Sequence, residues 1–394
     1  MTSKNNPPLG HCLGETSTEE FLNHYWQQKP LLIKGAFAGI QSPISADELA
    51  GLACEDNVNA RLVLEKDGDY PWQVEFGPFE ESRFSQLPKT HWSLLVSDVE
   101  KHLPETKFLV KAFRFIPDWR VDDLMISYAP EGGSVGAHTD AYDVFLIQLS
   151  GRRLWKIAQQ FPDETLDDVD LCILKNFSAE QEWLLDAGDM LYLPPNVAHH
   201  GIAQGGSEPC LTASVGFRAP SLKAITSDYV NYLNENVHGT TRYSDNSASI
   251  PEHHAEISEQ TVTQFIEYLK QGLSIDREQV KNWLGQYSSD NKTYEDLIEE
   301  QDVADYSELV IIAEQQTLEH SPYSHFLFSH SGSTALLFVN GHRYEVSPAF
   351  AESICDEDQL DFKQLQSVMT AADKKVLLVL FNNGAVVATE ETGH

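Results

Sequence analysis

Two histidines and one aspartate are the residues of this chain best suited to hold a metal ion. His138 and Asp140 stand two positions apart in the stretch SYAPEGGSVGAHTD, and side chains at that spacing on an extended backbone point to the same face. His199 follows much later, just after the Gly188-Asp189 turn and a Pro-Pro pair. Two histidines and one carboxylate leave positions open on an octahedral iron(II), which suits oxygen chemistry.

Other interpretations of these three residues remain open at this point. A His-x-Asp pair alone is weak evidence, and His138 and His199 could be ordinary half-buried histidines. Zinc could bind the same ligands, although a zinc hydrolase would also need a general base and an oxyanion partner, and no compelling set is visible. His200 is interpreted as lying outside the metal shell, because adjacent strand residues face opposite sides.

Arg153 is the second residue with a predicted chemical role. In its predicted strand it shares a face with Trp155 and Ile157, whose apolar side chains mark the inward side. A buried arginine needs an anionic partner, and its planar fork suits a carboxylate. That partner is either a protein acid, for example Asp143, or the carboxylate of a small-molecule cosubstrate. Ser127, on an earlier strand, could donate its hydroxyl to the same group.

The segment that carries these residues is predicted to be densely β. Short apolar runs alternate with turn signals at regular intervals, which favours a sandwich or barrel of the jelly-roll type. The Ser150-Gly151 pair indicates a hairpin between two of the strands. The predicted strands are 124–128, 143–149, 152–158, 182–185, 190–193 and 210–217.

Helices and strands alternate ahead of this region. Residues 1–13 are predicted to form a polar tail. Apolar residues at helical or alternating spacing then predict the elements that follow. Helices are expected from 17 to about 26 and over 46–54 and 91–103, and strands over 31–33, 59–65 and 72–76, the last two around a turn at 67–69.

Composition changes after Arg218-Ala219-Pro220. Apolar residues then recur every three or four positions in three segments, which predicts amphipathic helices. Asn340-Gly341 predicts a hairpin with a type I′ turn, and the combination of helices and hairpins indicates a small winged-helix-like α+β module. The predicted helices are 222–237, 258–273, 277–287 and 358–370, with an exposed polar loop at 239–254 and hairpins formed by 335–339 with 343–346 and by 376–381 with 385–388.

The charge of the chain limits its partners. Of 394 residues, 60 are acidic and 27 are basic, which gives a net charge of −33. Such a charge repels a phosphate backbone, so we expect no direct DNA binding. It permits steering of a basic protein partner, although solubility or a salt-adapted proteome would explain it equally well.

Cysteines and hydropathy indicate an intracellular protein. Five scattered cysteines without CxxC spacing argue against a disulfide framework or a zinc-thiolate site, and fit a reducing cytosol. The N-terminus has no apolar signal region, and no apolar run approaches the roughly 18 residues that a bilayer requires. We therefore expect a soluble, cytoplasmic protein without a membrane partner.

Four segments together carry a family resemblance. SYAPEGGSVGAHTDAYDVFLIQLSGRRLWKI, LDAGDMLYLPPNVAHHG, SVGFRAP and FLNHYWQQKPLLIKGAF resemble the JmjC-type 2-oxoglutarate oxygenases over about residues 15–220. Within that family the chain is most similar to the ribosomal oxygenases, and among them to the bacterial group that hydroxylates an arginine in protein sixteen of the large ribosomal subunit.

The resemblance implies a mainly β fold with α additions. We expect a double-stranded β-helix, which is a cupin-like jelly-roll JmjC barrel, over residues 1–220. A helical dimerisation region is expected over 221–300, followed by a winged-helix-like domain over 301–394. The partners implied are a basic ribosomal protein as substrate and a second copy of the chain in a homodimer.

The resemblance also assigns roles to the site residues. It implies that His138, Asp140 and His199 hold Fe(II), with 2-oxoglutarate and O₂ as cosubstrates. The far carboxylate of 2-oxoglutarate would bind Arg153 with help from Ser127; many JmjC enzymes use a lysine there, whereas this subfamily uses an arginine. The reaction implied is hydroxylation of a protein side chain.

The substrate site and the alternative functions are less well defined. An arginine substrate would need acidic and aromatic groups at the mouth of the site, and Glu131, Tyr142 and Asp143 are candidates because they lie near the ligands in sequence. The glycine-rich loop before His138 would form the rim. One alternative is a non-catalytic, cupin-like binding module associated with the ribosome. Another is a metal-dependent hydrolase or isomerase on the same barrel.

Overall fold

The chain folds into two units, each of which has its own hydrophobic core. The computed structural model describes residues 11–65, 72–167, 169–236, 242–244, 253, 255, 257–273, 275–290 and 292–389. The predicted turn at 67–69 and most of the predicted loop at 239–254 lie outside these residues. The units are Met1–Ala219 and Pro220–His394.

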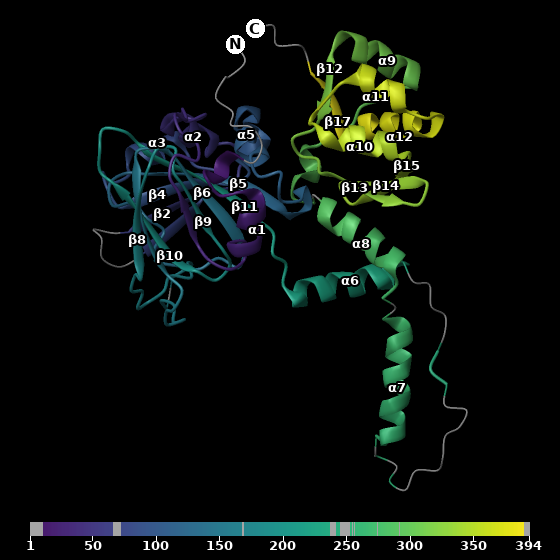
Figure 1. The fold of residues 1–394 in the computed structure, drawn as a ribbon, viewed down its shortest axis with the longest axis horizontal. Coiled ribbons are helices and arrows are strands. Elements are labelled where there is room, and N and C mark those ends of the chain that lie inside the picture. The colour runs from purple at the N-terminus through teal and green to yellow at the C-terminus, as the bar shows by residue number, and fades with distance from the viewer. Residues whose placement is uncertain are drawn as a thin grey trace. The chain divides into compact units, whose positions relative to one another are not determined.

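Two antiparallel sheets form the N-terminal unit (Figure 1). The small sheet has the order β10 (Ala198–Gln204), β7 (Arg152–Ala158), β8 (Gln181–Asp186). The large sheet has eight strands, in the order β1 (Leu31–Ile33), β9 (Met190–Leu193), β6 (Asp143–Ser150), β11 (Cys210–Phe217), β5 (Val121–Ala129), β4 (Trp92–Val96), β2 (Ala60–Glu65), β3 (Trp72–Phe76).

The alternation of apolar side chains explains how the two sheets face each other. Val144 and Leu146 of β6 pack in one cluster with Trp155 and Ile157 of β7, so this cluster fills the space between the sheets. The next residue on β6, Phe145, points the other way. Side chains that alternate on one strand serve two faces, and this arrangement confirms the predicted jelly-roll barrel.

Short helices cover the outer face of the large sheet. Phe21 of α1 is fully buried and lies 5.6 Å from Phe145, measured between ring centroids. Ser17 caps this helix by accepting a hydrogen bond from the backbone of Glu20. The helices of this unit are η1 (His11–Leu13), α1 (Thr18–His24), α2 (Ala46–Leu52), α3 (Glu81–Ser85), α4 (Val99–His102), η3 (Pro104–Thr106), α5 (Lys107–Lys111) and η4 (Asp118–Arg120).

Two N-terminal expectations are wrong in part. The segment 91–103 is not one helix, because Trp92–Val96 forms strand β4 between β2 and β5, and only Val99–His102 is helical. A short apolar run fits either structure, and here pairing with two neighbouring strands decides. The predicted tail also ends in a buried turn, since the side chain of Leu13 is only 1% exposed.

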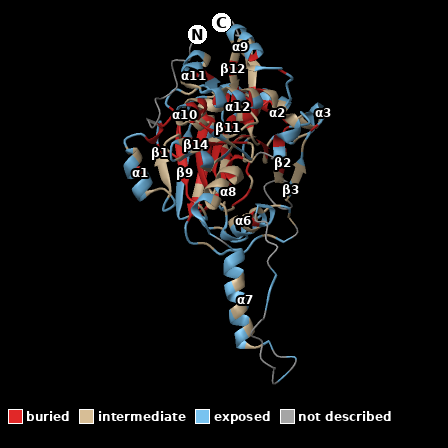
Figure 2. Cartoon of the chain, turned by 90° about the vertical axis from the view of Figure 1, so that its right-hand side faces the viewer, coloured by how far each residue is buried: buried red, intermediate tan, exposed pale blue. Residues whose placement is uncertain are grey.

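The C-terminal unit begins with three helices. The amphipathic helices predicted from the sequence are confirmed as α6 (Leu222–Asn236), α7 (Glu259–Gly272) and α8 (Arg277–Ser289). Trp283 of α8 is buried and donates a hydrogen bond to Asp228 of α6 at 2.7 Å. By contrast, no side chain of α7 is buried, and Figure 2 shows this helix in the colours of exposed and intermediate residues along its length.

Two three-stranded sheets and further helices complete this unit. The predicted hairpin between β14 and β15 is confirmed, with positive φ angles at Asn340 and Gly341 as a type I′ turn requires. The elements are η5 (Lys292–Leu297), α9 (Tyr306–Gln315), β12 (Thr317–His320), β13 (Phe326–Ser331), β14 (Thr334–Val339), β15 (His342–Val346), α10 (Pro348–Asp356), β16 (Gln359–Leu360), α11 (Phe362–Val368), α12 (Ala371–Asn382) and β17 (Val386–Thr389).

The second predicted C-terminal hairpin is wrong. The run 376–381 lies within helix α12, and β17 pairs with β12 instead of with a neighbour in sequence. Thr370 and Asp373 form a capping box that starts the helix. The predicted helix 358–370 is confirmed only over α11. Among the helices of the described residues, none combines the length and apolarity that crossing a membrane would need.

Candidate active site

The predicted metal ligands come together in the N-terminal unit. His138, Asp140 and His199 each offer a ligand atom, and these atoms lie within 4.8 Å of one another. Asp140 places one carboxylate oxygen 3.9 Å from His138 Nε2 and the other 3.5 Å from His199 Nε2. Nitrogen and oxygen atoms that converge in this way from three side chains can bind one metal ion.

Backbone hydrogen bonds hold the ligands in place. His138 donates its backbone N–H to the carbonyl of His199 at 3.0 Å, and His199 donates back to His138 at 2.9 Å. Asn196 donates its backbone N–H to the carbonyl of Asp140 at 2.7 Å. Strand β10, which carries His199, is not predicted from the sequence, because His199-His200-Gly201 interrupts the apolar alternation.

The Nδ1 atoms of both histidines form hydrogen bonds with backbone carbonyl oxygens. His138 Nδ1 lies 3.0 Å from the carbonyl oxygen of Gly136, and His199 Nδ1 lies 2.9 Å from that of Val197. A carbonyl only accepts, so Nδ1 carries the proton and Nε2 presents its lone pair toward Asp140. Burial lowers the pKa of His199 to about 4, with help from the neighbouring His138, and so favours the neutral, metal-binding form. This donor set fits Fe(II).

Arg153 is buried, and no acidic partner contacts it among the residues that the structure describes. Its side chain is 4% exposed, and its Nε and Nη2 atoms have no hydrogen-bond partner among the described residues. Asp143 is engaged elsewhere: it accepts hydrogen bonds from Arg120 at 3.2 Å and from the hydroxyl of Tyr192 at 2.6 Å. The alternative of an Arg153–Asp143 ion pair is therefore wrong, and the Arg153 fork can receive a carboxylate from a ligand.

Ser127 lies on the inner face of strand β5. Its neighbours Leu124 and Ile126 are fully buried in the outer core, so residues that alternate with them point to the inside of the barrel. Ser127 is 7% exposed, and its hydroxyl donates only a long hydrogen bond of 3.4 Å to the carbonyl of Thr212. This hydroxyl can turn to a ligand at little cost.

The three candidates for the substrate mouth have different surroundings. Asp143 is fully buried and hydrogen-bonded inside the unit, so it is not a mouth residue. The Glu131 side chain packs against Gly205. A Cβ atom added to Gly205 would lie 2.8 Å from the carboxylate carbon of Glu131. Tyr142 is half-buried, and burial together with the nearby Asp140 carboxylate raises the pKa of its hydroxyl.

Asp123 is an acidic residue near Tyr142 that sequence reasoning missed. A Cβ atom at Gly216 would lie 3.2 Å from Asp123 Oδ1 and 3.8 Å from the ring of Tyr142. Both side chains therefore pack against Gly216 and lie close to each other. Burial, together with the nearby Asp98 and Asp122, raises the pKa of Asp123 to about 7. The sequence could have indicated this position, because Asp123 and Ser127 are four residues apart on β5. Side chains at that spacing share one face of a strand, here the inner one.

The loop before His138 packs closely against its surroundings. Gly133 leaves no room for a side chain, since a Cβ atom there would lie 2.2 Å from the carbonyl oxygen of Trp92. Gly136 has a φ of +81° and touches Ile173. Glycine is required at both positions, because any side chain would displace the loop that presents His138.

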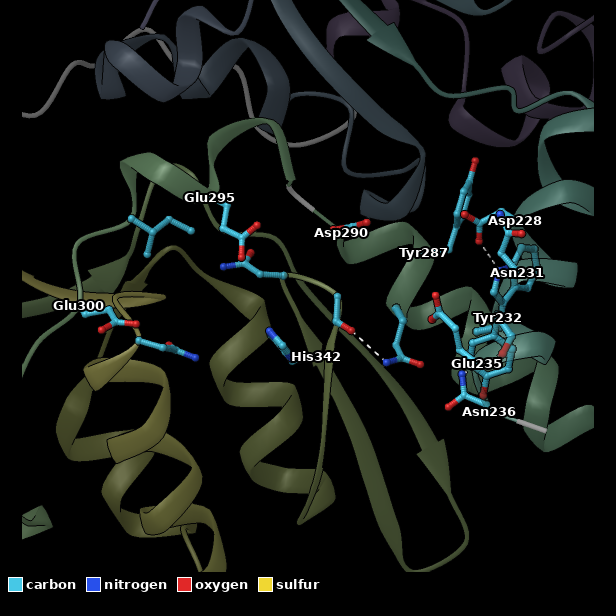
Figure 3. A pocket seen from close by; sticks show the side chains of 16 residues that line it. Asp228, Asn231, Tyr232, Glu235, Asn236, Tyr287, Asp290, Glu295, Glu300 and His342 are labelled. Atoms are coloured by element: carbon cyan, nitrogen blue, oxygen red, sulfur yellow. Dashed lines mark hydrogen bonds between the residues drawn. The ribbon is translucent and has the colours of Figure 1, made fainter. Parts of the chain in front are cut away.

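A separate pocket lies in the C-terminal unit (Figure 3). It has a volume of about 590 Å³, and its lining includes Asp228, Glu235, Glu295 and Glu300. None of the predicted site residues belongs to it. The candidate chemistry therefore lies within the barrel of the N-terminal unit.

Comparisons with known proteins agree with this geometry. The JmjC domain matches residues 108–225, and the ROXA-like winged helix matches residues 269–386. Ribosomal protein uL16 3-hydroxylase of Escherichia coli is 39% identical over 274 residues, which cover 69% of this chain and 71% of that protein. A probable ribosomal oxygenase of Haemophilus influenzae is 41% identical over 219 residues, which cover 54% of this chain and 53% of that protein.

Solved structures show the same similarity. The X-ray structure of E. coli YcfD superposes with a TM-score of 0.82 at 32% identity, over 95% of this chain and 98% of that one. The ribosomal oxygenase YcfD in complex with cobalt and 2-oxoglutarate has a TM-score of 0.77 at 32% identity, over 94% of this chain and 97% of that one. The chain therefore belongs to the family of JmjC-domain ribosomal oxygenases.

Proposed function

We propose that this chain is an Fe(II)- and 2-oxoglutarate-dependent dioxygenase that hydroxylates a side-chain carbon of a ribosomal protein. The observation that carries the proposal is the pairing of β7 with β10. This pairing places Arg153, whose buried Nε and Nη2 atoms have no hydrogen-bond partner among the described residues, on the strand next to the one that holds His199. A metal triad beside a buried guanidinium suits a ligand that chelates metal at one end and carries a carboxylate at the other.

Each residue of the site has a defined task in this proposal. His138 and His199 bind the metal through Nε2, and Asp140 binds it through a carboxylate oxygen. Arg153 and Ser127 hold the far carboxylate of 2-oxoglutarate. Bound iron with 2-oxoglutarate and O₂ supplies the oxidation that replaces a C–H hydrogen with a hydroxyl, and releases succinate and carbon dioxide.

The wall of the barrel keeps water away from the metal site and helps to align the substrate. Trp155, Leu185 and Val197 are buried around the inner face near His199. Apolar walls keep solvent from reactive groups, and fixed ligands hold the target C–H bond at one distance. The protein therefore supplies binding and orientation, and the metal and cosubstrate supply the oxidising power.

The substrate side chain in this proposal is an arginine of the large-subunit protein that corresponds to uL16. Support comes from the name of the E. coli relative, which is a uL16 3-hydroxylase. Tyr142 provides an aromatic ring near the metal ligand Asp140, and Asp123 provides a carboxylate near Tyr142. A guanidinium suits both, through a charge-assisted hydrogen bond and through cation–π contact. The net charge of −33 attracts a basic protein and repels nucleic acid.

The proposal includes a homodimer that acts in the cytoplasm, where ribosomal proteins are made. The exposed apolar face of α7 supports self-association, because Phe265, Ile266 and Leu269 are each more than 40% exposed. Contiguous apolar surface of this kind marks protein contacts. We further propose the predicted division into a catalytic domain, a dimerisation region over 221–300 and a domain over 301–394.

Mass spectrometry of ribosomal proteins tests the function. Cells with the gene should carry a large-subunit protein heavier by one oxygen atom on an arginine, and cells with only the His138→Ala form should lack it. Purified protein should also form succinate from 2-oxoglutarate only when Fe(II) and O₂ are present. No succinate, even with the ribosomal protein added, would favour the non-catalytic binding module. Turnover that is indifferent to oxygen would favour a hydrolase or isomerase.

A further inference from the structure

The indole N–H of Trp155 is a buried hydrogen-bond donor that the proposed site does not yet use. The Trp155 side chain is 5% exposed, and its Nε1 atom has no partner among the described residues. A donor that is removed from water without an acceptor costs about 1–3 kcal/mol. The same part of the barrel holds the two unpartnered nitrogens of Arg153. Neighbouring donors without acceptors indicate that the acceptor arrives with a ligand.

Trp155 lies between the metal ligand and the guanidinium. On the paired strands, His199 is opposite Ile157, Gly201 is opposite Trp155, and Ala203 is opposite Arg153. The indole ring lies 5.8 Å from the ring of His199, between centroids, and the Arg153 Cζ atom lies 5.8 Å from the indole centroid. The indole therefore lies between the two ends of the site that the proposed ligand would span.

Gly201 fixes the position of the ring. A Cβ atom at Gly201 would lie 2.6 Å from the Trp155 ring, so the six-membered part of the indole packs closely against the backbone of β10. The ring cannot move toward β10, and this contact restricts the position of the indole N–H inside the barrel. A donor fixed in this way is prepared for an acceptor at one position.

We propose that Trp155 donates its indole N–H to the far carboxylate of 2-oxoglutarate and is a positioning residue of the cosubstrate site. This inference rests on the proposed function, which supplies the dicarboxylate. A carboxylate offers about four lone-pair sites. Nε and Nη2 of Arg153, the hydroxyl of Ser127 and Nε1 of Trp155 are four donors, so one carboxylate has enough acceptor sites for all of them.

Apolar packing alone does not account for this tryptophan. Trp155 belongs to a cluster with Ile157, Leu185 and Leu191, and a phenylalanine would fill much of the same space without a buried donor. Its cross-strand neighbour Trp183 on β8 offers a matched comparison, because it packs against the same cluster but is only half-buried.

The test compares Trp155→Phe with Trp183→Phe in the full-length chain loaded with Fe(II) under anaerobic conditions. Calorimetry measures the Kd for 2-oxoglutarate. We expect Trp155→Phe to raise this Kd by about tenfold to 100-fold, as loss of one hydrogen bond to a charged group predicts. Trp183→Phe should leave it within about twofold, and metal affinity should be unchanged in both variants.

The outcomes separate this inference from the proposed function. If the unsubstituted chain binds 2-oxoglutarate and Trp155→Phe binds it equally well, the positioning role is overturned and the proposed function stands. If Trp183→Phe loses as much, or if Trp155→Phe loses metal affinity, the ring acts only through packing. If the unsubstituted chain does not bind 2-oxoglutarate, both proposals fail.

A second measurement does not depend on folding of the Trp155 variant. In the unsubstituted chain with Zn(II) and ¹⁵N-labelled tryptophan, addition of 2-oxoglutarate should move one indole N–H proton signal downfield. That signal should persist in Trp183→Phe, which excludes the neighbouring ring. If no indole signal moves downfield while 2-oxoglutarate binds, the hydrogen bond does not form and the inference is wrong.

Discussion

His138 and His199 exchange two backbone hydrogen bonds, of 3.0 and 2.9 Å, and their rings lie 4.2 Å apart. This isolated antiparallel bridge joins the loop before the metal site to strand β10. The distance between the two imidazoles is therefore set by backbone geometry. Side-chain flexibility contributes little, because each ring is also tied through Nδ1 to a nearby carbonyl.

Replacing His138 with alanine should abolish iron binding and turnover. Two ligands cannot hold Fe(II) as three do, and the loss should exceed about 100-fold in metal affinity. Calorimetric titration with Fe(II) measures this. His200→Ala is the control, because His200 adjoins His199 and lies outside the cluster of ligand atoms; it should retain metal binding. Turnover of the His138→Ala variant at the unsubstituted rate would exclude the triad.

Replacing Arg153 with alanine should raise the KM for 2-oxoglutarate by about 30-fold or more. Truncating one partner of a buried charge pair typically costs 2–5 kcal/mol. Succinate formation at varied 2-oxoglutarate measures the change, and circular dichroism checks that the fold is intact. Arg152→Ala is the control, because Arg152 is exposed on the opposite face of β7. An unchanged KM in Arg153→Ala would mean that the arginine is structural.

Replacing Asp123 with asparagine should lower kcat/KM for an arginine-containing ribosomal protein by about tenfold to 100-fold. The variant loses the charge that would pair with a guanidinium, at a cost of about 1.5–3 kcal/mol. The Kd for 2-oxoglutarate should stay the same, because Asp123 is not among its proposed donors. Glu131→Gln is the comparison, and an equal or larger loss there would place the substrate contact at Glu131.

Glu100→Gln should flatten the pH dependence of stability. Burial raises the pKa of Glu100 from its ordinary 4.5 to about 8, with Lys101 opposing and Asp98 and Asp123 adding to the rise. Between those values the folded chain keeps a proton that the unfolded chain has released, so the free energy of unfolding falls as pH rises. The glutamine can still accept the hydrogen bond from the backbone of Leu124.

Urea unfolding followed from about pH 5 to about pH 9 measures this effect. The variant should lose less stability over that range and should exceed the unsubstituted chain near pH 8. Some slope should remain, because burial also raises the pKa of the neighbouring Asp123 to about 7. Parallel curves for the two proteins would show that Glu100 does not titrate in this window.

Replacing Leu269 with aspartate should disrupt the proposed homodimer. Leu269 is 57% exposed on the apolar face of α7, and a charge there opposes burial against a second copy. Sedimentation should show twice the chain mass of 44.2 kDa for the unsubstituted protein and 44.2 kDa for the variant. Gln271→Asp on the polar face should remain dimeric. A single-chain mass for the unsubstituted protein at micromolar concentration would contradict the dimer.

The residue types of the site could be predicted from the sequence because they depend on local rules. His138 and Asp140 follow a two-residue spacing, and the burial of Arg153 follows the alternation of a strand. The strands themselves were predictable where apolar residues alternate between turn signals. The predictions failed over 91–103 and 376–381, because short apolar runs fit a helix or a strand until their neighbours are known.

The tertiary structure alone decided which groups remain free to act. Asp143 is close to the ligands in sequence, yet it is engaged with Arg120 and Tyr192, and Arg153 is left without an acidic partner within the described part of the chain. Distant strands brought His199 to His138 and placed Trp155 between the metal site and the guanidinium. Sequence determines which donors and acceptors exist; whether each one is satisfied depends on contacts between segments far apart in the chain, which only the folded barrel creates.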